Sequence, residues 1–347
     1  MGALAFDGQF FKKYEKNGAF GRNGFIRIIN KVLILHNGPI SKFLLHMPNM
    51  NMFLDSFEEV DQWMMLLSRN GVRELILTIS NRRYELPSYV FSCLELTKLK
   101  LKNCFFKPPL NFEGFLNLDH LILRHVDFRA NLCGTQIKLP QLKKLSLHSC
   151  ANVYNFNIKA TNLFRLAITA CPDAMLATML SNMTKIKCFH VDAQFLKIFT
   201  AENIPNWLPH PVNSFTDVWF GKFQLGDLHQ LHGALCLLRN SPNLNTLGMH
   251  FEMKPGVNVG PASSILESPN CVVYKLYRLQ TVEITCLHGS KPELLFVKLL
   301  LAHSPSLHKF TITPSRALDV KKILDISKDV MRFPRASPKA EMIYLNP

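Results

Sequence analysis

The chain has 347 residues, of which 48% are hydrophobic and 19% are charged, and this composition excludes a chain that is disordered throughout. Lys and Arg total 40 against 25 for Asp and Glu, a formal net charge of +15 that favours acidic partners without choosing among acidic proteins, phosphorylated segments, nucleic acid and anionic lipid. No stretch reaches the roughly 18 uninterrupted apolar residues of a membrane-spanning helix, so we expect no membrane among the partners.

The amino-terminal segment, residues 1–35, lacks the signs of export or lipid attachment. It has no basic stretch followed by an apolar run, and Phe6 stands where a myristoylation signal requires Ser or Thr. Nine cysteines are spread along the chain without a C-x-x-C pair, which argues against both a disulfide framework and a zinc site. We therefore expect a protein of the cytoplasm, the nucleus or both, with no metal and no cofactor.

An apolar phrase recurs through residues 36–270. Its clearest copy has Leu96, Leu99 and Leu101 followed by Cys104, which fits the pattern L-x-x-L-x-L-x-x-N/C at every position. Six consecutive copies begin at positions 72, 96, 118, 142, 163 and 186, so they are 24, 22, 24, 21 and 23 residues apart. Spacings of about 20–29 residues are typical of leucine-rich repeats. Later copies begin at 215, 244, 279 and 307, and their longer spacing predicts a full helix or an inserted loop in each.

The spacing within each copy predicts a short strand. The second and third apolar residues are two positions apart, so both point to one face of the strand, where stacking of successive copies buries them. Helical periodicity predicts helices over residues 57–68, 229–240 and 294–303, the last two followed by Ser-Pro-x-Leu and a strand. The sequence thus predicts an α/β leucine-rich-repeat solenoid, a horseshoe with parallel strands on its concave face and helices on its convex face.

The residues between the buried ones point outward from the predicted strands. In four consecutive copies no acidic residue occupies these outward positions, and the basic ones form what we call the basic strip: Lys98, Lys100, Lys102, His120, Arg124, Lys144, His148 and Arg165. Like charges on neighbouring strands repel unless something neutralises them. Our hypothesis is that the basic strip binds an acidic or phosphorylated segment of a partner protein. The alternative is that these side chains only keep an exposed sheet soluble.

The carboxyl-terminal residues, 271–347, follow a recognisable order. A strand leads to Gly289 and a helix, then to a Ser-Pro-x-Leu strand and an amphipathic helix, and the chain closes with Arg335-Ala336-Ser337 and an extended stretch over 342–345. This order resembles the FBD module of plant F-box/FBD/LRR-repeat proteins, and Arg-Ala-Ser is its most specific signature. Upstream, residues 32–40 resemble the first strand and turn of the same proteins.

The resemblance covers essentially the whole chain. It divides the chain into an amino-terminal segment that follows the F-box position (1–35), leucine-rich repeats (36–270) and an FBD-like module (271–347). It implies the substrate-recognition part of an SCF-type E3 ubiquitin ligase receptor. In that family an F-box docks on the adaptor subunit, and nothing in this sequence resembles an F-box. We therefore expect a protein substrate as partner, and the adaptor only if the full-length product carries an F-box.

Catalytic motifs are not found in the sequence. No H-E-x-x-H, G-x-S-x-G, Walker-type or G-x-G-x-x-G phrase occurs, so we expect a protein that is not an enzyme. Nucleic-acid binding remains as an alternative function because of the charge alone. It is the less favoured one, since no aromatic residues interleave with the basic strip and no nucleic-acid-binding domain is recognised.

Overall fold

A computed structural model describes residues 2–15, 24–47, 57–80, 82–129, 136–172, 185–201, 212–254, 256, 258–268 and 276–347. Its internal contacts group the chain into two compact units. Unit 1 comprises Met1–Phe164 and Cys171–Met183, and unit 2 comprises Arg165–Ala170 and Thr184–Pro347. In the described parts of the chain, no helix combines the length and the apolar character needed to cross a bilayer.

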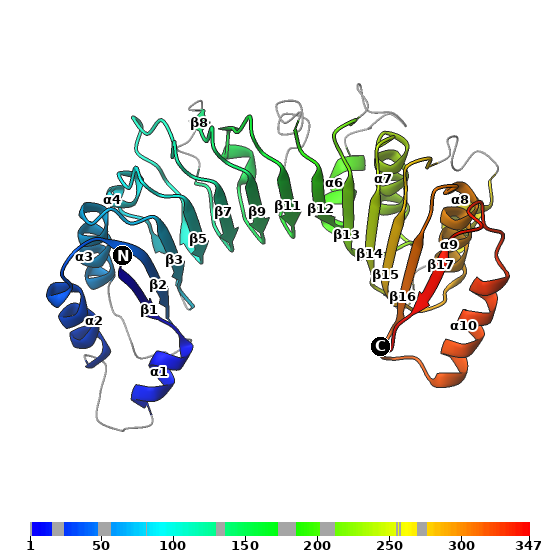
Figure 1. The fold of residues 1–347 in the computed structure, drawn as a ribbon, viewed down its shortest axis with the longest axis horizontal. Coiled ribbons are helices and arrows are strands. Elements are labelled where there is room, and N and C mark those ends of the chain that lie inside the picture. The colour runs from blue at the N-terminus through cyan, green and yellow to red at the C-terminus, as the bar shows by residue number, and fades with distance from the viewer. Residues whose placement is uncertain are drawn as a thin grey trace. The chain divides into compact units, whose positions relative to one another are not determined.

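Unit 1 contains a parallel sheet in which the strands follow one another in chain order, as Figure 1 shows. Its strands are β1 (Gly2–Phe6), β2 (Ile40–His46), β3 (Glu74–Thr78), β5 (Lys98–Lys102), β7 (His120–Arg124) and β9 (Lys144–His148). The repeat leucines pair in register from strand to strand, with Leu99 opposite Leu121 and Leu121 opposite Leu145. This register confirms the predicted leucine-rich-repeat fold.

The interior of unit 1 is formed by the repeat positions that the sequence identified. Leu96, Leu99, Leu101 and Cys104 are all fully buried. Burial alternates along β5 because successive side chains of a strand point to opposite faces. Four two-residue strands lie outside this sheet: β4 (Tyr84–Glu85), β6 (Cys104–Phe105), β8 (Ile137–Lys138) and β10 (Ile158–Lys159). β4 pairs with β6, and β8 pairs with β10.

A left-handed residue ends several of these strands. Asn103, His125 and Ser149 have φ values of 58°, 51° and 51°. This conformation is costly for a residue with a Cβ, so surrounding contacts must hold it. In the first two cases the backbone N–H of the left-handed residue donates to a carbonyl of the next strand, Asn103 to Arg124 at 3.0 Å and His125 to His148 at 2.8 Å. The turn then directs the following residue into the core.

The described helices of unit 1 are α1 (Gly8–Glu15), α2 (Gly24–Leu35), α3 (Glu58–Arg69) and the short α4 (Ser88–Phe91). A 3-10 turn lies at Val153–Asn155. The helix expected over 57–68 is α3, which ends just before Gly71 with its φ of 65°. The strand inferred from residues 32–40 is wrong in its first part, because residues 32–35 complete α2. The buried residues of α2 include Phe25, Ile26, Ile29 and Leu33, which are spaced as on one face of a helix. This spacing favours a helix over a strand for the whole segment.

Unit 2 has a second run of parallel strands in chain order: β11 (Arg165–Thr169), β12 (Cys188–Asp192), β13 (Asp217–Phe223), β14 (Thr246–Phe251), β15 (Thr281–Leu287), β16 (Lys309–Pro314) and β17 (Glu341–Tyr344). Its longer repeats hold complete helices: α6 (Ala193–Ala201), α7 (Leu228–Arg239), α8 (Gly260–Glu267), α9 (Lys291–His303) and α10 (Val320–Arg332). These helices pack on the inward side of the strands, as the contact between Phe296 of α9 and Phe223 of β13 illustrates (ring centroids 6.1 Å apart).

The carboxyl-terminal residues continue the repeat order of unit 2. Strand β17 pairs in parallel with β16, and the Ser337 hydroxyl donates to the carbonyl of Leu307 at 2.6 Å. Ala336 donates its backbone N–H to Leu301 at the end of α9. The Arg-Ala-Ser stretch therefore closes the last repeat. An FBD-like module over 271–347 and the boundaries at 35/36 and 270/271 stay predictions.

Candidate functional site

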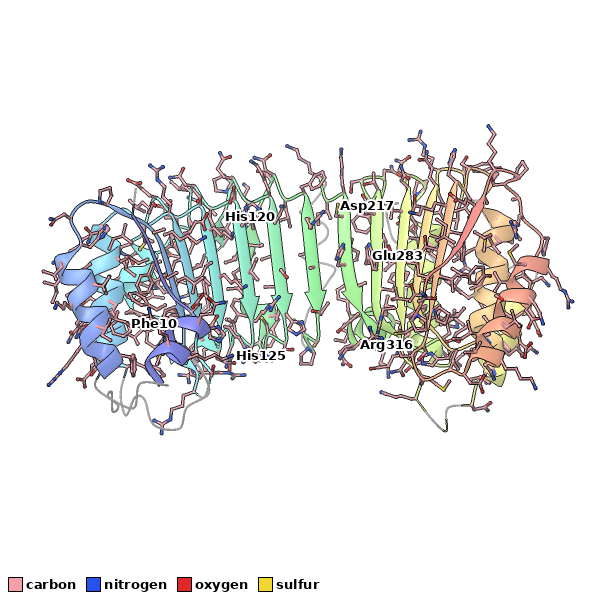
Figure 2. The ribbon with its side chains drawn as sticks, turned by 60° about the horizontal axis from the view of Figure 1, so that its bottom comes forward. Phe10, His120, His125, Asp217, Glu283 and Arg316 are labelled. Carbon is pink, nitrogen blue, oxygen red and sulfur yellow. The ribbon has the colours of Figure 1, made fainter. Side chains whose placement is uncertain are left out.

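The outward face of the strands in unit 1 carries most of the basic strip. Seven of its eight members lie on β5, β7 and β9, and the strand register sets six of them in two rows. One row is Lys98, His120 and Lys144, and the other is Lys102, Arg124 and His148. Lys100 lies between these rows, opposite Ile122. Figure 2 shows His120 where β7 begins and His125 just beyond its end. The eighth member, Arg165, begins β11 and belongs to unit 2.

The electrostatics of the strip are those of cations held close together. The pKa of Lys100 lies below its ordinary value, because partial burial disfavours the charged amine and because Arg124 and Lys98 repel it. Among the described residues no carboxylate lies within ion-pair distance of Lys98, Lys100, Lys102, Arg124 or Lys144. These five side chains carry positive charge that the described part of the chain does not pair.

Several basic groups around this set do have acidic partners. At the start of the strands Lys42 pairs with Glu74 at 3.2 Å, and His120 bonds to the carboxylate of Asp119. Beyond the strand ends, Arg83 pairs with Asp127 at 2.8 Å. There too Arg129 lies over the ring of Phe105, 3.5 Å from its centroid, and within 3.9 Å of Glu85. The Lys and Arg side chains of β5, β7 and β9 have no such partner among the described residues.

His125 adjoins the basic strip, although the sequence analysis did not include it. Its ring lies 5.9 Å from that of His148. Its pKa is below the ordinary value, because of partial burial and then because of the charges of His148, Lys102, Arg83 and Arg124. The residue follows the strand rather than lying in it, so strand periodicity alone could not have found it.

Arg165 has different surroundings from the rest of the strip. Its guanidinium lies 3.9 Å from the sulfur of Cys188, and that sulfur lies 3.7 Å from a carboxylate oxygen of Asp217. Arg165 and Asp217 thus flank one cysteine on the outward face of unit 2. The structure therefore groups seven members of the strip and leaves Arg165 in an environment that already contains an acidic residue.

The outward face of unit 2 has an aromatic feature that the sequence analysis did not single out. Trp219 on β13 pairs with Gly248 on β14, and Gly248 pairs with Glu283 on β15. The ring of His190 lies 6.0 Å from the Trp219 ring, tilted by 43°. Burial and the charge of Arg165 lower the pKa of His190, while Asp217 opposes this shift. The repeat spacing allows the outward position of Trp219 to be predicted. The orientation of its ring depends on Gly248, which follows 29 residues later.

The described residues offer no metal site, and their shifted cysteine thiols have raised pKa values except Cys150, whose pKa is lowered chiefly by its contact with the Cys171 side chain. No group of three or more His, Cys, Asp or Glu residues within the described ranges could hold a metal ion. Burial raises the pKa of the Cys104 thiol to about 12 and that of Cys93 to about 11, so both are protonated at neutral pH. Cys133 and Cys271 lie outside the described residues.

Comparison with known proteins agrees with this architecture. The family model described as "At1g61320/AtMIF1, LRR domain" matches residues 32–206. The Arabidopsis thaliana "F-box/FBD/LRR-repeat protein At1g13570" is 28% identical over 352 aligned residues, which cover 92% of this chain and 83% of the relative. The match to this relative extends far beyond the repeats that the family model recognises. The chain therefore belongs to the At1g61320/AtMIF1 leucine-rich-repeat family and is a homologue of a plant F-box/FBD/LRR-repeat protein.

Proposed function

We propose that this protein is a non-enzymatic interaction scaffold whose basic strip binds an acidic or phosphorylated segment of a protein substrate. The observation that carries the proposal is the set of five cations on β5, β7 and β9 without an acidic partner among the described residues. The protein acts in the cytoplasm, the nucleus or both, and it needs no cofactor.

The physical reason lies in the spacing of the strands. Neighbouring strands lie about 4.8 Å apart, so Lys102 and Arg124 face each other at a distance at which like charges destabilise the sheet. An anionic ligand removes this repulsion and gains charge-assisted hydrogen bonds at the same time. The pKa of Lys100 is lowered first by partial burial and then by this repulsion from Arg124 and Lys98. Ligand binding should therefore raise that pKa again.

Within a ligase, the chain would supply the substrate-recognition part of an SCF-type E3 ubiquitin ligase receptor. Support comes from the homologue, which is named an F-box/FBD/LRR-repeat protein. Docking on the adaptor subunit of the ligase is part of the proposal only for a full-length product that carries an F-box. Residues 271–347 act as the FBD-like module, and residues 36–270 as the repeats that meet the substrate.

Charge reversal tests the proposed site. In the double variant Lys100→Glu/Arg124→Glu, two unpaired cations become anions, and we expect affinity for a fluorescent Glu-rich peptide, or its phosphoserine analogue, to fall about 30-fold, equivalent to roughly 2 kcal/mol. Fluorescence anisotropy measures the loss. Lys309→Glu on β16 makes the same kind of charge change in unit 2 and should bind like the wild type.

Two results would contradict the proposal. One is a double variant that binds both peptides with unchanged affinity. The other is a preference for duplex DNA over both peptides, with a steep loss of affinity in added salt that follows the number of phosphates neutralised. The second result would assign the basic strip to nucleic acid instead.

A further inference from the structure

An indole ring covers a glycine on the outward face of unit 2. A Cβ built on Gly248 would lie 2.2 Å from Cδ2, 2.2 Å from Cε2 and 2.5 Å from Cε3 of Trp219. Cδ2 and Cε2 form the bond shared by the two rings of indole, so the glycine faces the middle of the ring system rather than its edge. Gly248 is buried although its position is an outward one, because the indole lies over it. One face of the indole therefore rests on β14, and the other is directed away from the sheet.

The surroundings of this indole leave its outer face accessible. On β13 itself the neighbouring outward positions are Asp217 and Gly221, and on β14 they are Thr246 and His250. Among the described residues the Trp219 ring contacts one other ring, that of His190, with the centroids 6.0 Å apart. The lowered pKa of that histidine leaves it uncharged near neutral pH. The indole thus has no protein cation over its face in the described part of the chain.

A carboxylate lies on the far side of the same glycine. Glu283 pairs with Gly248 across β14 and β15, and Figure 2 shows it in the middle of the outward strand face. No ion pair or hydrogen bond of its side chain occurs among the described residues. Neither Arg165 nor Lys309 is paired with Glu283 in the strand register. Arg165 lies beside Cys188 and Asp217, and Lys309 is opposite Thr281, two residues before Glu283.

We infer that Trp219 and Glu283 form a second interaction site, which receives a lysine or arginine side chain of a partner protein. The face of an indole carries the negative part of its quadrupole and attracts a cation placed within about 6 Å of the ring centroid. Glu283 supplies a full negative charge beside it. The site differs from the basic strip in its unit and in its charge preference, so it goes beyond the proposed function and does not depend on it.

The ligand test uses short peptides that differ only in the charged group. The full chain is labelled with 5-fluorotryptophan, so that Trp63, Trp207 and Trp219 give separate fluorine signals, and Trp219→Phe assigns the third. We expect the Trp219 signal to shift on titration with acetyl-Gly-Arg-Gly-amide and acetyl-Gly-Lys-Gly-amide. The norleucine peptide, which has similar length without charge, should leave it in place.

Variants of the protein test the two halves of the site. Glu283→Gln should weaken binding of the cationic peptides about five-fold, the upper end expected for a partly exposed ion pair. Gly248→Val should abolish binding while keeping Trp219, because the new side chain occupies the space of the indole. Glu341→Gln on β17 removes the same charge elsewhere on the outward face and serves as the matched control.

Three outcomes would overturn the inference. The first is equal binding of the norleucine peptide, which would make the indole a plain apolar contact. The second is wild-type affinity in Glu283→Gln, and the third is a shift of the Trp63 signal in place of the Trp219 signal. The double variant Lys100→Glu/Arg124→Glu should bind the cationic peptides like the wild type, so a failure of the basic strip as a site leaves this test intact.

Discussion

At the scale of single residues, His125 links the basic strip to pH. Its pKa in the folded protein lies below the ordinary value of 6.5, so the folded state favours the uncharged imidazole. The stability that this contributes is complete above the unfolded pKa and is lost as the pH falls through the folded pKa. An anionic ligand beside His125 stabilises the charged imidazole, so its pKa rises on binding and the complex takes up a proton.

Affinity for the Glu-rich peptide should therefore increase as the pH is lowered from about 7.5 towards 6, where the ligand-bound imidazole becomes protonated. A Glu-rich peptide suits this measurement better than a phosphopeptide, because phosphate itself titrates near pH 6. Anisotropy titrations at several pH values provide the readout. In His125→Gln the increase should shrink, and a profile identical to that of the wild type would contradict the assignment.

Other single residues show how far sequence reasoning reaches. The outward direction of Lys98, Lys100 and Lys102 follows from the two-residue period of a strand, so their placement could be predicted. The orientation of Trp219 could not, because it requires that the next strand carry a glycine at the paired position. The surroundings of Arg165 could not be predicted either, because they depend on Cys188 and on Asp217, which is more than 50 residues away in the chain.

At the scale of elements, the start of α9 shows why helices of unit 2 begin where they do. Ser290 and Glu293 form a reciprocal capping box, in which a carboxylate oxygen of Glu293 accepts from the backbone N–H of Ser290 at 2.9 Å. The same oxygen accepts from the N–H of His288 at 3.1 Å. Glu293 is only 5% exposed, so these bonds satisfy a carboxylate that burial would otherwise penalise.

Replacement of Ser290 by alanine should lower the free energy of unfolding by about 1 kcal/mol, the usual cost of losing such a cap. Chemical denaturation measures the change, and hydrogen exchange in the first turn of α9 should quicken. Ser327→Ala provides a matched control, because Ser327 lies inside α10, where alanine is the better helix former. An equal effect of both substitutions would argue against the capping role.

The misassigned stretch at 32–35 has an elementary cause. Four consecutive apolar residues fit a buried strand and a helix equally well, and only the longer window distinguishes them. The buried residues of α2 begin at Gly24 and continue at helical spacing to Leu33. Ile34 and Leu35 are 73% and 64% exposed, as expected for the end of an amphipathic helix.

At the scale of the molecule, a repeat protein distributes its stability through contacts between neighbours. The fully buried Leu121 packs in register between Leu99 and Leu145. Leu121→Ala should cost about 2–5 kcal/mol, the range for a leucine removed from a packed core. Because each repeat contacts its neighbours, we expect hydrogen exchange to accelerate in β5, β7 and β9 of unit 1 and to change little in β15 and β16 of unit 2.

Mass spectrometry of exchanged peptides gives this measurement directly. Leu116→Ala is the matched control, because Leu116 is 53% exposed and its truncation removes little buried surface. Uniform acceleration over both units would mean that the chain unfolds as one block, and it would contradict the expectation that each repeat is stabilised mainly by its neighbours.

The in-register pairing of β5, β7 and β9 turns Lys102, Arg124 and His148 into a ladder with rungs about 4.8 Å apart. An α-helix laid across these rungs advances about 5.4 Å per turn, so it offers one side chain to each rung in succession. In an extended peptide, side chains on the same side are about 6.6–6.8 Å apart. After two strands their positions no longer match those of the basic side chains. The ladder is therefore matched to an acidic helix whose carboxylates or phosphates recur once per turn.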